Sequence, residues 1–523
     1  MANAPDRSAA AASRERLERL DERPFPPGDY DVVLVGSGPG GLQTAYSLAR
    51  TGIPRCAVIS RDAAPGGMFR RFPVYQRLIS WTKPDAPFER GTREYEWYDH
   101  NSLVGDEREH QALAPEFMDR AFDVPARPEM EAALVEFAMR GDVRVRYGCE
   151  WLSTRRDDAG FVLDTSDGEY RCRVCVFAIG VTEPWVAPIP GLEAAPHYVA
   201  ANAPERYEGK SVFIVGKRNS GFELAQGLLP WARRIVLGSP RPVDTAMLAF
   251  SPLSIRYLSP YTEHVRGGTG SYVVDAAIER VERNADGYRI YASGTTWEGE
   301  LELEVDEVIA ATGFRAPVRD LPTLGVAMVN DGRMPAQTPY WESVSVPGIY
   351  FAGNLTQASP GLRKHGATSS SGSVNGYRYN ACVLARHIAE KHFGLGRERR
   401  SLNSDEVVPH LLGELAHAPE LWTQKGYLAR VVDIDGADGI RDEGIVPLAD
   451  FVDRDDGDAC AVAVEYDADG TIIPVVYLRR GGHLVEHQLP PHPLHRFGTD
   501  EHRQQLAACL APLLSGKASA TRI

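Results

Sequence analysis

The segment YDVVLVGSGPGGLQTAYSLARTGI, residues 30–53, predicts the fold of this protein. It opens with DVVLV, a continuous apolar stretch of the kind that forms a buried parallel strand. Gly36, Gly38 and Gly41 then follow in the GxGxxG spacing. The first glycine permits a tight turn, the second lets backbone amides approach a pyrophosphate, and the third lets the next helix pack on the strand. This segment is therefore predicted to bind a dinucleotide at the positive amino end of that helix.

The ribose-binding residue of such a site is not where the pattern places it. The second strand of the motif is expected to end in an acidic residue about 20 positions downstream. Here the strand CAVIS ends in Ser60, followed by Arg61 and Asp62. Ser60 could make one weaker hydrogen bond, or Asp62 could reach back to the ribose, and the sequence leaves both options open.

A second segment, KSVFIVGKRNSGFELAQGLLPWA at residues 210–232, repeats the strand, glycine and helix pattern. Gly216 and Gly221 keep the first and third glycine positions, but Arg218 occupies the second. The arginine blocks the closest backbone approach, yet it and Lys217 could meet cofactor phosphates. The residues of this loop expected to bind a second dinucleotide are Gly216, Lys217, Arg218, Asn219 and Ser220.

Two apolar strands flank the second segment, CVFAIG at 175–180 and EVIAATGF at 307–314. They are predicted to be the two crossings of a chain that leaves one domain, builds another and returns. The first domain should resume with GIYFAGNLTQ, a strand that ends at Gly353 and Asn354. After about residue 396 the composition changes, and residues 465–489 alternate like paired strands around an Asp-Gly turn.

The predicted fold class is α/β, with one Rossmann-like domain inserted into another and a small α+β extension at the carboxyl end. The expected boundaries are 1–29 for an amino-terminal tail, 30–182 and 312–395 for the first domain, 183–311 for the inserted domain, and 396–523 for the extension.

Composition excludes several classes of protein. The chain has 523 residues, 43% of them hydrophobic, and no apolar run approaches the roughly 20 residues of a membrane helix. Its net charge of −14 disfavours nucleic-acid and anionic-membrane partners. Its seven cysteines are sparse and odd in number, and its start lacks the apolar core of a secretory signal. A soluble, cytoplasmic protein without a bound metal is expected.

Together these features resemble the flavoproteins with two dinucleotide-binding domains, a group that includes flavin-containing monooxygenases, N-hydroxylases and disulfide reductases. Within this group the chain is similar to FAD-dependent oxidoreductase-domain proteins related to the endoplasmic-reticulum flavoprotein of degradation pathways. The similarity covers most of residues 30–430. It is carried by four segments: RRFPVYQRLISWTK (70–83), YDHNSL (98–103), GLRKHGATSSSGSVNGYRYNA (361–381) and ELWTQKGYLARVV (420–432).

The resemblance implies FAD in the first domain. Asn354 stands where the family usually has an aspartate on the ribityl chain, and an amide can still bond a hydroxyl. The helix that begins near Ser371 would point its amino end at the flavin pyrimidine, where negative charge gathers on reduction. The implied FAD-binding residues are Gly36, Gly38, Pro39, Gly40, Gly41, Ser60, Arg61, Gly67, Met68, Phe69, Gly353 and Asn354.

The second cofactor is expected to be NADPH. An NAD site would end its second strand in an acidic residue, whereas a 2′-phosphate is accommodated by arginine or small donors. The strand RRIVLGSPRP (233–242) offers Ser239 and Arg241, with Arg233 and Arg234 upstream. The alternative is that these arginines are ordinary surface residues.

Cys172 and Cys175 have the CxxC spacing that a disulfide reductase needs beside its flavin. They lie in the strand that leads to FAIG, however, where residues three apart point to opposite faces. Redox pairs prefer a helix amino terminus, which stabilises a thiolate. Ordinary core packing is therefore predicted for both. The remaining chemistry is reaction with oxygen, in which NADPH-reduced FAD forms a peroxyflavin and oxygenates a substrate.

Four residues are candidates for catalysis. Related monooxygenases hold NADP and peroxide with an asparagine, and the matching stretch LISWTK has Trp81 or Thr82 at that place. Thr82 could donate a hydrogen bond, and Lys83 could reach a phosphate or the flavin. Asn101 and His365 are the other candidates, with a helix cap and a solvated loop histidine as their alternative roles.

The predicted function is an NADPH-dependent FAD monooxygenase of a small-molecule substrate, with N- or C-oxygenation open. The Baeyer-Villiger signature FxGxxxHxxxWP is not present, although His197 lies in a loosely similar frame. Two alternatives stay open: a flavin oxidoreductase that passes electrons to another acceptor, and a binding module whose FAD is structural. The expected partners are the substrate and molecular oxygen, with a homodimer as a candidate assembly.

Overall fold

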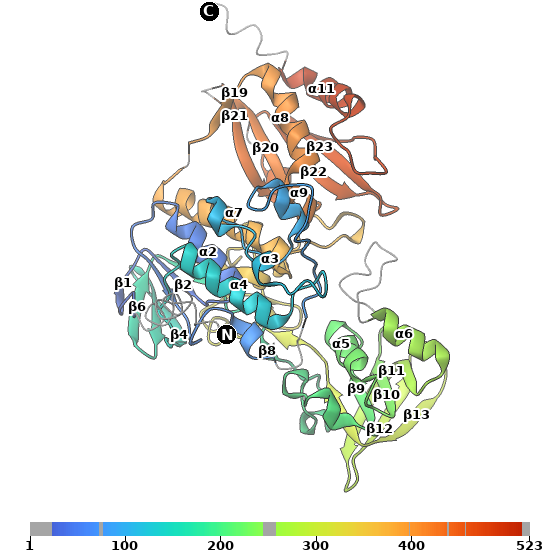
Figure 1. Cartoon of the computed structure of the whole chain (residues 1–523). Helices are drawn as coiled ribbons and strands as arrows, with labels where there is room; N and C mark the ends of the chain where they lie inside the picture. Colours follow the sequence, from blue (N-terminus) through green and yellow to red (C-terminus); the bar gives the residue numbers. More distant parts are fainter. Residues whose placement is uncertain are drawn as a thin grey trace, which may run out of the picture.

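A computed structural model of the chain describes residues 23–72, 77–243, 258–396, 398–436, 439–455 and 457–514. These residues form three domains, each with its own sheet, which Figure 1 shows in blue to cyan and gold, in green, and in orange to red. Residues 1–22 of the expected tail lie outside the described part. Among the described residues, no helix is both long and apolar enough to cross a membrane.

The first domain is built on a four-stranded parallel sheet. Its strands, in spatial order, are β18 (Ile349–Phe351), β7 (Val174–Phe177), β2 (Val32–Val35) and β3 (Cys56–Ile59). Nearly every residue of these strands is buried, which explains why they are apolar throughout instead of alternating.

Both faces of this sheet are covered. Val32, Leu34 and Val176 pack on one side against α2 (Pro39–Ala49), α4 (Arg127–Arg140) and α7 (Val374–Phe393). On the other side lies a second sheet, in which β1 (Gly28–Asp29), β6 (Gly168–Cys172), β5 (Gly160–Thr165) and β4 (Trp151–Asp157) are neighbours in that order. Short elements complete the domain: α3 (Ala114–Phe117), η1 (Gly67–Arg70), η2 (Glu94–Tyr98), η3 (Arg108–His110), η7 (Gly353–Ala358), η8 (Lys364–Gly366), β16 (Met328–Val329) and β17 (Met334–Pro335).

The inserted domain has a six-stranded sheet. Its order is β13 (Glu300–Val305), β12 (Tyr288–Gly294), β11 (Ser271–Arg283), β10 (Arg234–Ser239), β9 (Ser211–Val215) and β14 (Glu307–Ala310). The last four of these are parallel, and β12 and β13 are antiparallel additions. Its helical elements are α5 (Asn219–Leu228), α6 (Leu258–Gly267), η4 (Leu192–Ala194), η5 (Tyr198–Ala200) and η6 (Pro204–Tyr207).

The two crossings between these domains run side by side. The chain leaves the first domain after β7 and returns after β14. In these two crossings, β8 (Glu183–Pro184) of the outgoing segment pairs with β15 (Phe314–Arg315) of the returning segment in an antiparallel ribbon. Figure 1 shows the inserted domain standing to one side of the first at the end of this ribbon. The predicted α/β architecture with one Rossmann-like domain inserted in another is confirmed.

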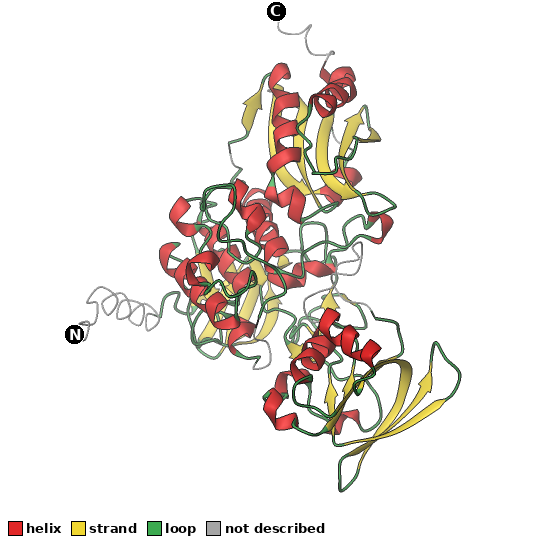
Figure 2. Cartoon of the chain, turned by 45° about the vertical axis from the view of Figure 1, so that its right-hand side comes forward, coloured by secondary structure: helices red, strands yellow, loops and turns green. Residues whose placement is uncertain are grey.

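The C-terminal domain is an antiparallel sheet with helices on both faces (Figure 2). Its strands, in spatial order, are β19 (Arg400–Leu402), β21 (Gly439–Pro447), β20 (Leu428–Gly436), β22 (Ala459–Tyr466), β23 (Ile472–Arg480) and β24 (His483–Gln488). α8 (Ser404–His417), α9 (Pro419–Thr423) and α11 (Asp500–Leu514) share one apolar cluster, and α10 (Leu448–Asp453) lies in another.

This domain is packed firmly on the first domain. A single apolar core runs from α2 and α7 into α8, α9 and β20. Trp97 of η2 packs against Trp422 of α9 with ring centroids 4.6 Å apart. Arg93 donates to both Glu414 and Glu420, at 2.9 and 2.8 Å. The C-terminal domain is therefore docked against the first domain through a shared core and is not attached by a linker alone.

Candidate functional site

A cleft opens at the carboxyl ends of the parallel strands of the first domain, which is where ligands bind in open α/β sheets. It is lined by Gly36–Gly40 after β2, by Ala178–Gly180 after β7 and by Ala352–Asn354 after β18. This lining joins the glycine loop after β2 to the ends of two further parallel strands, which is where a dinucleotide binds in folds of this type.

Three glycines of the first fingerprint are required by the packing of the protein itself. A Cβ on Gly36 would lie 2.4 Å from the carbonyl oxygen of Ala178, and the φ of Gly36 is +118°. A Cβ on Gly41 would lie 2.2 Å from the carbonyl oxygen of Gly36. A Cβ on Gly40 would lie 2.2 Å from the Cα of Gly353. Any side chain at these positions would push two backbone segments apart.

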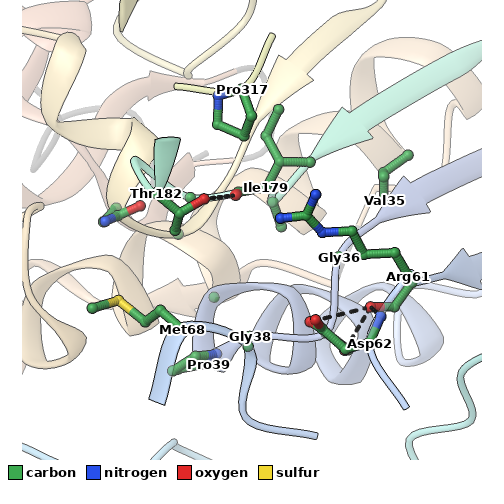
Figure 3. Close-up of a pocket in the computed structure, with 18 of the residues that line it drawn as sticks. Val35, Gly36, Gly38, Pro39, Arg61, Asp62, Met68, Ile179, Thr182 and Pro317 are labelled. Carbon is green, nitrogen blue, oxygen red and sulfur yellow. Dashed lines mark hydrogen bonds between the residues drawn. The ribbon is translucent and has the colours of Figure 1, made fainter. Parts of the chain in front are cut away.

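Gly38 differs from its neighbours. A Cβ at this residue would meet no protein atom within 4 Å, and its φ of −70° suits any amino acid. Gly38 is nonetheless the amino cap of α2 and forms part of the cleft wall (Figure 3). The space that its missing side chain leaves therefore suits a ligand lying against the backbone. The pyrophosphate of FAD is such a ligand, because a helix amino terminus favours anions.

Ser60 and Asp62 are the two candidates for the role of the acidic residue that the second strand lacks. Ser60 is buried, bonded to Ser37 at 2.8 Å, and its Oγ lies 3.5 Å from Oδ2 of Asp62 and accepts from the Asp62 amide. The carboxylate of Asp62 lines the cleft beside Gly38 and Arg61, with Arg71 as its ion-pair partner at 3.4 Å (Figure 3). Ser60 and Asp62 both line the cleft, and the ribose-binding role of either stays a prediction.

Several residues of the cleft wall could not be predicted from a sequence motif. Arg319 pairs with Glu150, and its guanidinium carbon lies 5.6 Å from the ring centroid of Trp151. These side chains come from distant segments, and none belongs to a motif. Thr182, Pro317 and Tyr377 also line the cleft. Of the implied FAD-binding residues, all but Gly41 form part of the wall, and Gly41 lies behind it against Gly36.

The second fingerprint repeats the packing of the first. A Cβ on Gly216 would lie 2.3 Å from the carbonyl oxygen of Ala311, and the φ of Gly216 is +125°. A Cβ on Gly221 would lie 2.4 Å from the carbonyl oxygen of Gly216. Arg218 is the exposed amino cap of α5, whose first residues are Asn219 and Ser220.

Lys217 does not face this loop's solvent side. Its side chain is 1% exposed, and its ammonium donates to the carbonyl oxygen of Val274 at 3.0 Å and to the carboxylate of Asp275. Hydrogen bonding to Lys217 lowers the pKa of Asp275. The expectation that Lys217 meets cofactor phosphates is therefore not met in this structure, because Asp275 of β11 already neutralises this lysine.

The residues considered for NADPH binding lie at two opposite ends of β10. Ser239 and Arg241 lie at the carboxyl end of β10, where Ser239 donates to the carbonyl oxygen of Arg241 at 3.5 Å. Arg233 and Arg234 lie at the opposite end, where Arg233 pairs with Asp306 and Arg234 donates to Ser211. Five residue steps of strand span about 16 Å, so only Ser239 and Arg241 are near the glycine loop.

Thr82 and Asn101 are brought together, but inside the protein. Thr82 is 0% and Asn101 1% exposed. Thr82 donates to Asp99 at 2.7 Å, and the amide of Asn101 donates to Thr82 at 3.0 Å and to the carbonyl oxygen of Ser80. Buried Arg378 of α7 donates to the backbone of the same segment. Neither Thr82 nor Asn101 is among the residues of the cleft wall, and both side chains have structural partners.

Lys83 and His365 are exposed and also lie outside the cleft wall. The ammonium of Lys83 lies 6.0 Å from the ring centroid of Tyr98. His365 lies in the loop ahead of α7 with a φ of +52°. Catalytic roles for these four residues therefore stay predictions, and the geometry of the cleft adds no support to them.

The cysteine pair is close together, contrary to the expectation that its members point to opposite faces. Cys172 Sγ lies 3.4 Å from Cys175 Sγ. The expectation was wrong because the two residues do not share a strand: Cys172 ends β6 of one sheet and Cys175 lies in β7 of the other. Both thiols are buried in the apolar cluster between the sheets, and burial raises the pKa of Cys175 well above its ordinary value.

Comparison with known proteins agrees with this geometry. The sequence profile of the pyridine nucleotide-disulphide oxidoreductase family matches residues 33–353. FAD-dependent oxidoreductase domain-containing protein 2 of Danio rerio is 31% identical over 470 residues, which cover 78% of this chain and 66% of the relative. This chain thus spans slightly less than two thirds of that relative's length.

Two further similarities cover smaller shares of the chain. Ferredoxin–NADP reductase of Thermus thermophilus is 28% identical over 317 residues, which cover 57% of this chain and 84% of the relative. The solved structure of a flavin-containing monooxygenase from Stenotrophomonas maltophilia superposes with a TM-score of 0.52 at 19% identity, covering 69% of this chain and 99% of the other. At that identity the structural match shows the shared fold alone.

Proposed function

This chain belongs to the pyridine nucleotide-disulphide oxidoreductase family, and we propose that within it the protein is an NADPH-dependent FAD monooxygenase of a small-molecule substrate. The family supports the broader part of this statement, an oxidoreductase that uses FAD and NAD(P)H. The choice of NADPH and of oxygen as the electron acceptor is the proposal. Ser239 and Arg241, in place of an acidic residue after β10, support the choice of NADPH.

One observation supports direct transfer of electrons from the flavin. None of the described residues that line the cleft is a cysteine. The close thiol pair, Cys172 and Cys175, lies between two sheets in the hydrophobic core. A relay of electrons through a dithiol beside the flavin is therefore not supplied by the described part of the chain. The flavin has to react with its electron acceptor itself.

The residues of the cleft have defined tasks in this proposal. Gly38 and the amino end of α2 would receive the pyrophosphate, and Asp62 would receive the ribose of the adenosine. Asn354 would bond the ribityl hydroxyls, and Tyr377 in the first turn of α7 would border the flavin end. FAD supplies the hydride acceptor and the reactivity with oxygen. The protein fixes its position and restricts the access of water.

Incorporation of isotopic oxygen tests the proposal. The balanced reaction consumes one NADPH, one proton and one oxygen molecule, inserts one oxygen atom in the substrate and releases the other as water. Purified FAD-loaded protein would be given NADPH, ¹⁸O₂ and a panel of amines, sulfides and ketones, with product masses read by mass spectrometry. We expect one labelled oxygen in a product for each NADPH consumed in its formation. Recovery of the label only as hydrogen peroxide would contradict oxygenation.

A second candidate is a reductase that passes electrons to a separate acceptor. Its support is the similarity to ferredoxin–NADP reductases. The reduced flavin would then react slowly with oxygen in air and would be reoxidised quickly by an added one-electron acceptor such as ferricyanide. If neither NADPH nor NADH reduces the flavin in an anaerobic stopped-flow experiment, the result contradicts both enzymes and supports a structural FAD.

A further inference from the structure

A second cavity lies where the first and C-terminal domains meet. Its walls come from the loop of residues 360–369, which leads towards α7, and from Lys425–Tyr427 and Glu465–Tyr466 of the C-terminal domain. Three cationic side chains reach it: Arg363, Lys364 and Lys425. Two of the three, Arg363 and Lys425, have no carboxylate partner among the described residues.

Lys364 is fully paired. Its ammonium lies 3.1 Å from Glu465 of β22, pairs with Glu486 of β24, and donates to the hydroxyl of Tyr477. These contacts fasten the loop ahead of α7 to the C-terminal sheet. Lys364 thus has two carboxylate partners, of which Glu465 lines the cavity, and needs no further anion.

Lys425 has an ammonium without a counter-ion among the described residues. It donates to the carbonyl oxygen of Trp422 and lies 5.6 and 5.7 Å from the ring centroids of Trp422 and Tyr466. Burial alone lowers the pKa of Lys425 to about 8, with no carboxylate acting against it. A cation that is taken out of water without an ion-pair partner is costly to the fold. A bound anion would relieve that cost.

Arg363 is held at the same cavity by an unusual backbone. Its φ and ψ of +51° and +37° lie in the left-handed region, and His365 two residues later has a φ of +52°. Residues other than glycine adopt this conformation uncommonly, asparagine, aspartate and histidine more often than the rest, and such strain clusters at ligand sites. No ion pair of Arg363 occurs among the described residues. The loop thus holds a guanidinium at the cavity at a conformational cost.

The cavity is coupled to the FAD cleft through Gln424, the neighbour of Lys425. Gln424 is 0% exposed and donates to Ser371 Oγ at 3.0 Å and to Asn380 Oδ1 at 2.8 Å, while it accepts from the amide of Ser370. The loop from Ser370 continues into α7, whose Tyr377 lines the FAD cleft. A group bound by Lys425 is therefore held at a fixed place relative to α7.

We propose that Lys425 and Arg363 bind a carboxylate group of the substrate. The identity of this ligand as a substrate rests on the proposed function, whereas the anion site itself does not. Since Glu465 and Glu486 together exceed the charge of Lys364 by one, the group of five side chains carries one net positive charge. A monoanion neutralises that charge, and a phosphate dianion exceeds it. The planar fork of arginine also matches a carboxylate.

Fluorine NMR of FAD-loaded full-length protein, without NADPH, tests the site. The probes are trifluoroacetate and its neutral counterpart trifluoroacetamide, with acetate and inorganic phosphate as competitors. We expect saturable broadening for trifluoroacetate only, displaced better by acetate than by phosphate. Lys425→Met and Arg363→Met should each weaken binding at least tenfold, and Lys425→Arg should restore it. Lys210→Met, which removes a lysine of the inserted domain paired with Glu307, is the matched control and should change nothing.

Several outcomes would overturn this inference. They are equal broadening by the amide, stronger competition by phosphate than by acetate, and unchanged binding in both methionine variants. If Lys425→Met loses its yellow FAD colour through misfolding, the exposed Arg363→Met variant carries the same test. The assay uses neither NADPH nor oxygen, so a failure of the monooxygenase proposal leaves its result unaffected. Conversely, loss of anion binding says nothing against oxygenation of a neutral substrate.

Discussion

The two glycine loops of this protein share the packing of their outer glycines but differ at the middle position of the fingerprint. In both, the first glycine has a φ near +120° and would place a Cβ within 2.4 Å of an alanine carbonyl oxygen. In both, the third glycine would place a Cβ within 2.4 Å of the first glycine's oxygen. At the middle position, however, one loop has Gly38 and the other has Arg218.

The difference separates two physical requirements that the GxGxxG pattern combines. The fold requires the outer glycines, because the strand, the turn and the helix cannot approach one another without them. The fold does not require the middle glycine, because no protein atom lies within 4 Å of a Cβ at Gly38, so its role is to leave space for the ligand. The inserted domain can therefore carry an arginine there and still fold. The following predictions are ordered from the largest expected effect to the smallest.

The outer glycines should be the most sensitive. Gly36→Ala places a Cβ against the carbonyl of Ala178 and forces alanine into a strained backbone. Overpacking and strain each cost about 1 to 3 kcal/mol, so we expect a loss of about 3 kcal/mol or more and of bound FAD. Gly216→Ala should show the same loss, confined to the inserted domain. Urea unfolding followed by flavin fluorescence and by limited proteolysis measures both. Wild-type unfolding of either variant would contradict the packing argument.

The ion pair behind the second loop should rank next. Asp275→Asn leaves Lys217, which is 1% exposed, without its carboxylate. Breaking a buried pair costs about 3 to 5 kcal/mol. The Asp275 side chain is one quarter exposed, so about 2 kcal/mol of stability of the inserted domain is a reasonable expectation. Lys217→Met should destabilise the domain less, because the charge that it leaves unpaired belongs to Asp275, the more exposed partner.

Acid titration sharpens the same prediction. Lys217 holds the pKa of Asp275 below its ordinary value, so the pair stabilises the folded state above the unfolded pKa, about 3.9. That stabilisation is lost as the pH falls through the lower, folded pKa. Thermal melts of the inserted domain should become acid-sensitive below about pH 4 in the native protein and less so in Asp275→Asn. Equal acid sensitivity in both would argue against the pair.

The middle glycine should affect binding and not folding. Gly38→Ala adds a methyl group that meets no protein atom, so the stability of the FAD-free protein should stay within about 0.5 kcal/mol. FAD affinity should fall about 10- to 100-fold, or about 1.4 to 2.8 kcal/mol. Calorimetry of FAD-free protein titrated with FAD measures this. A destabilised protein with normal FAD affinity would mean that the residue serves the fold after all.

Arg218 should have the smallest effect. Arg218→Gly restores the full fingerprint but removes an exposed cation at the amino end of α5. We expect NADPH affinity to fall by about 1 kcal/mol, roughly fivefold, while FAD content stays unchanged. Stopped-flow reduction at varied NADPH concentrations gives the affinity, and flavin absorbance gives the content. Loss of FAD with unchanged NADPH affinity would mean that the two loops have exchanged roles.

The elements of both nucleotide domains were predictable because their signals are local. A buried parallel strand is apolar throughout, as β2 and β9 are, and a glycine at its end marks a turn that only glycine allows. The two crossings could be predicted from β7 and β14 for the same reason. The candidate site was predictable as far as it consists of this backbone, from Gly36 to Met68 and at Gly353 and Asn354.

Side-chain partners were less accessible. The sequence left Ser60 and Asp62 as alternatives, and only the folded loop brings the carboxylate beside Gly38. The position of Lys217 in the sequence suggests that it binds a phosphate, yet Asp275, 58 residues later, forms an ion pair with it. Cys172 and Cys175 have strand spacing, yet a change of sheet between them brings their sulfur atoms to 3.4 Å.

The two strand, turn and helix units, their order in the chain and the expectation of dinucleotide ligands follow from the amino-acid sequence, because backbone conformation within a turn depends on neighbouring residues. The folded chain is needed to know which side chains face the cleft, which are neutralised inside the protein, and where the C-terminal domain places Gln424 and Lys425. Those outcomes depend on contacts between segments that are far apart in the chain, and burial decides whether a charge finds a partner, a ligand or water.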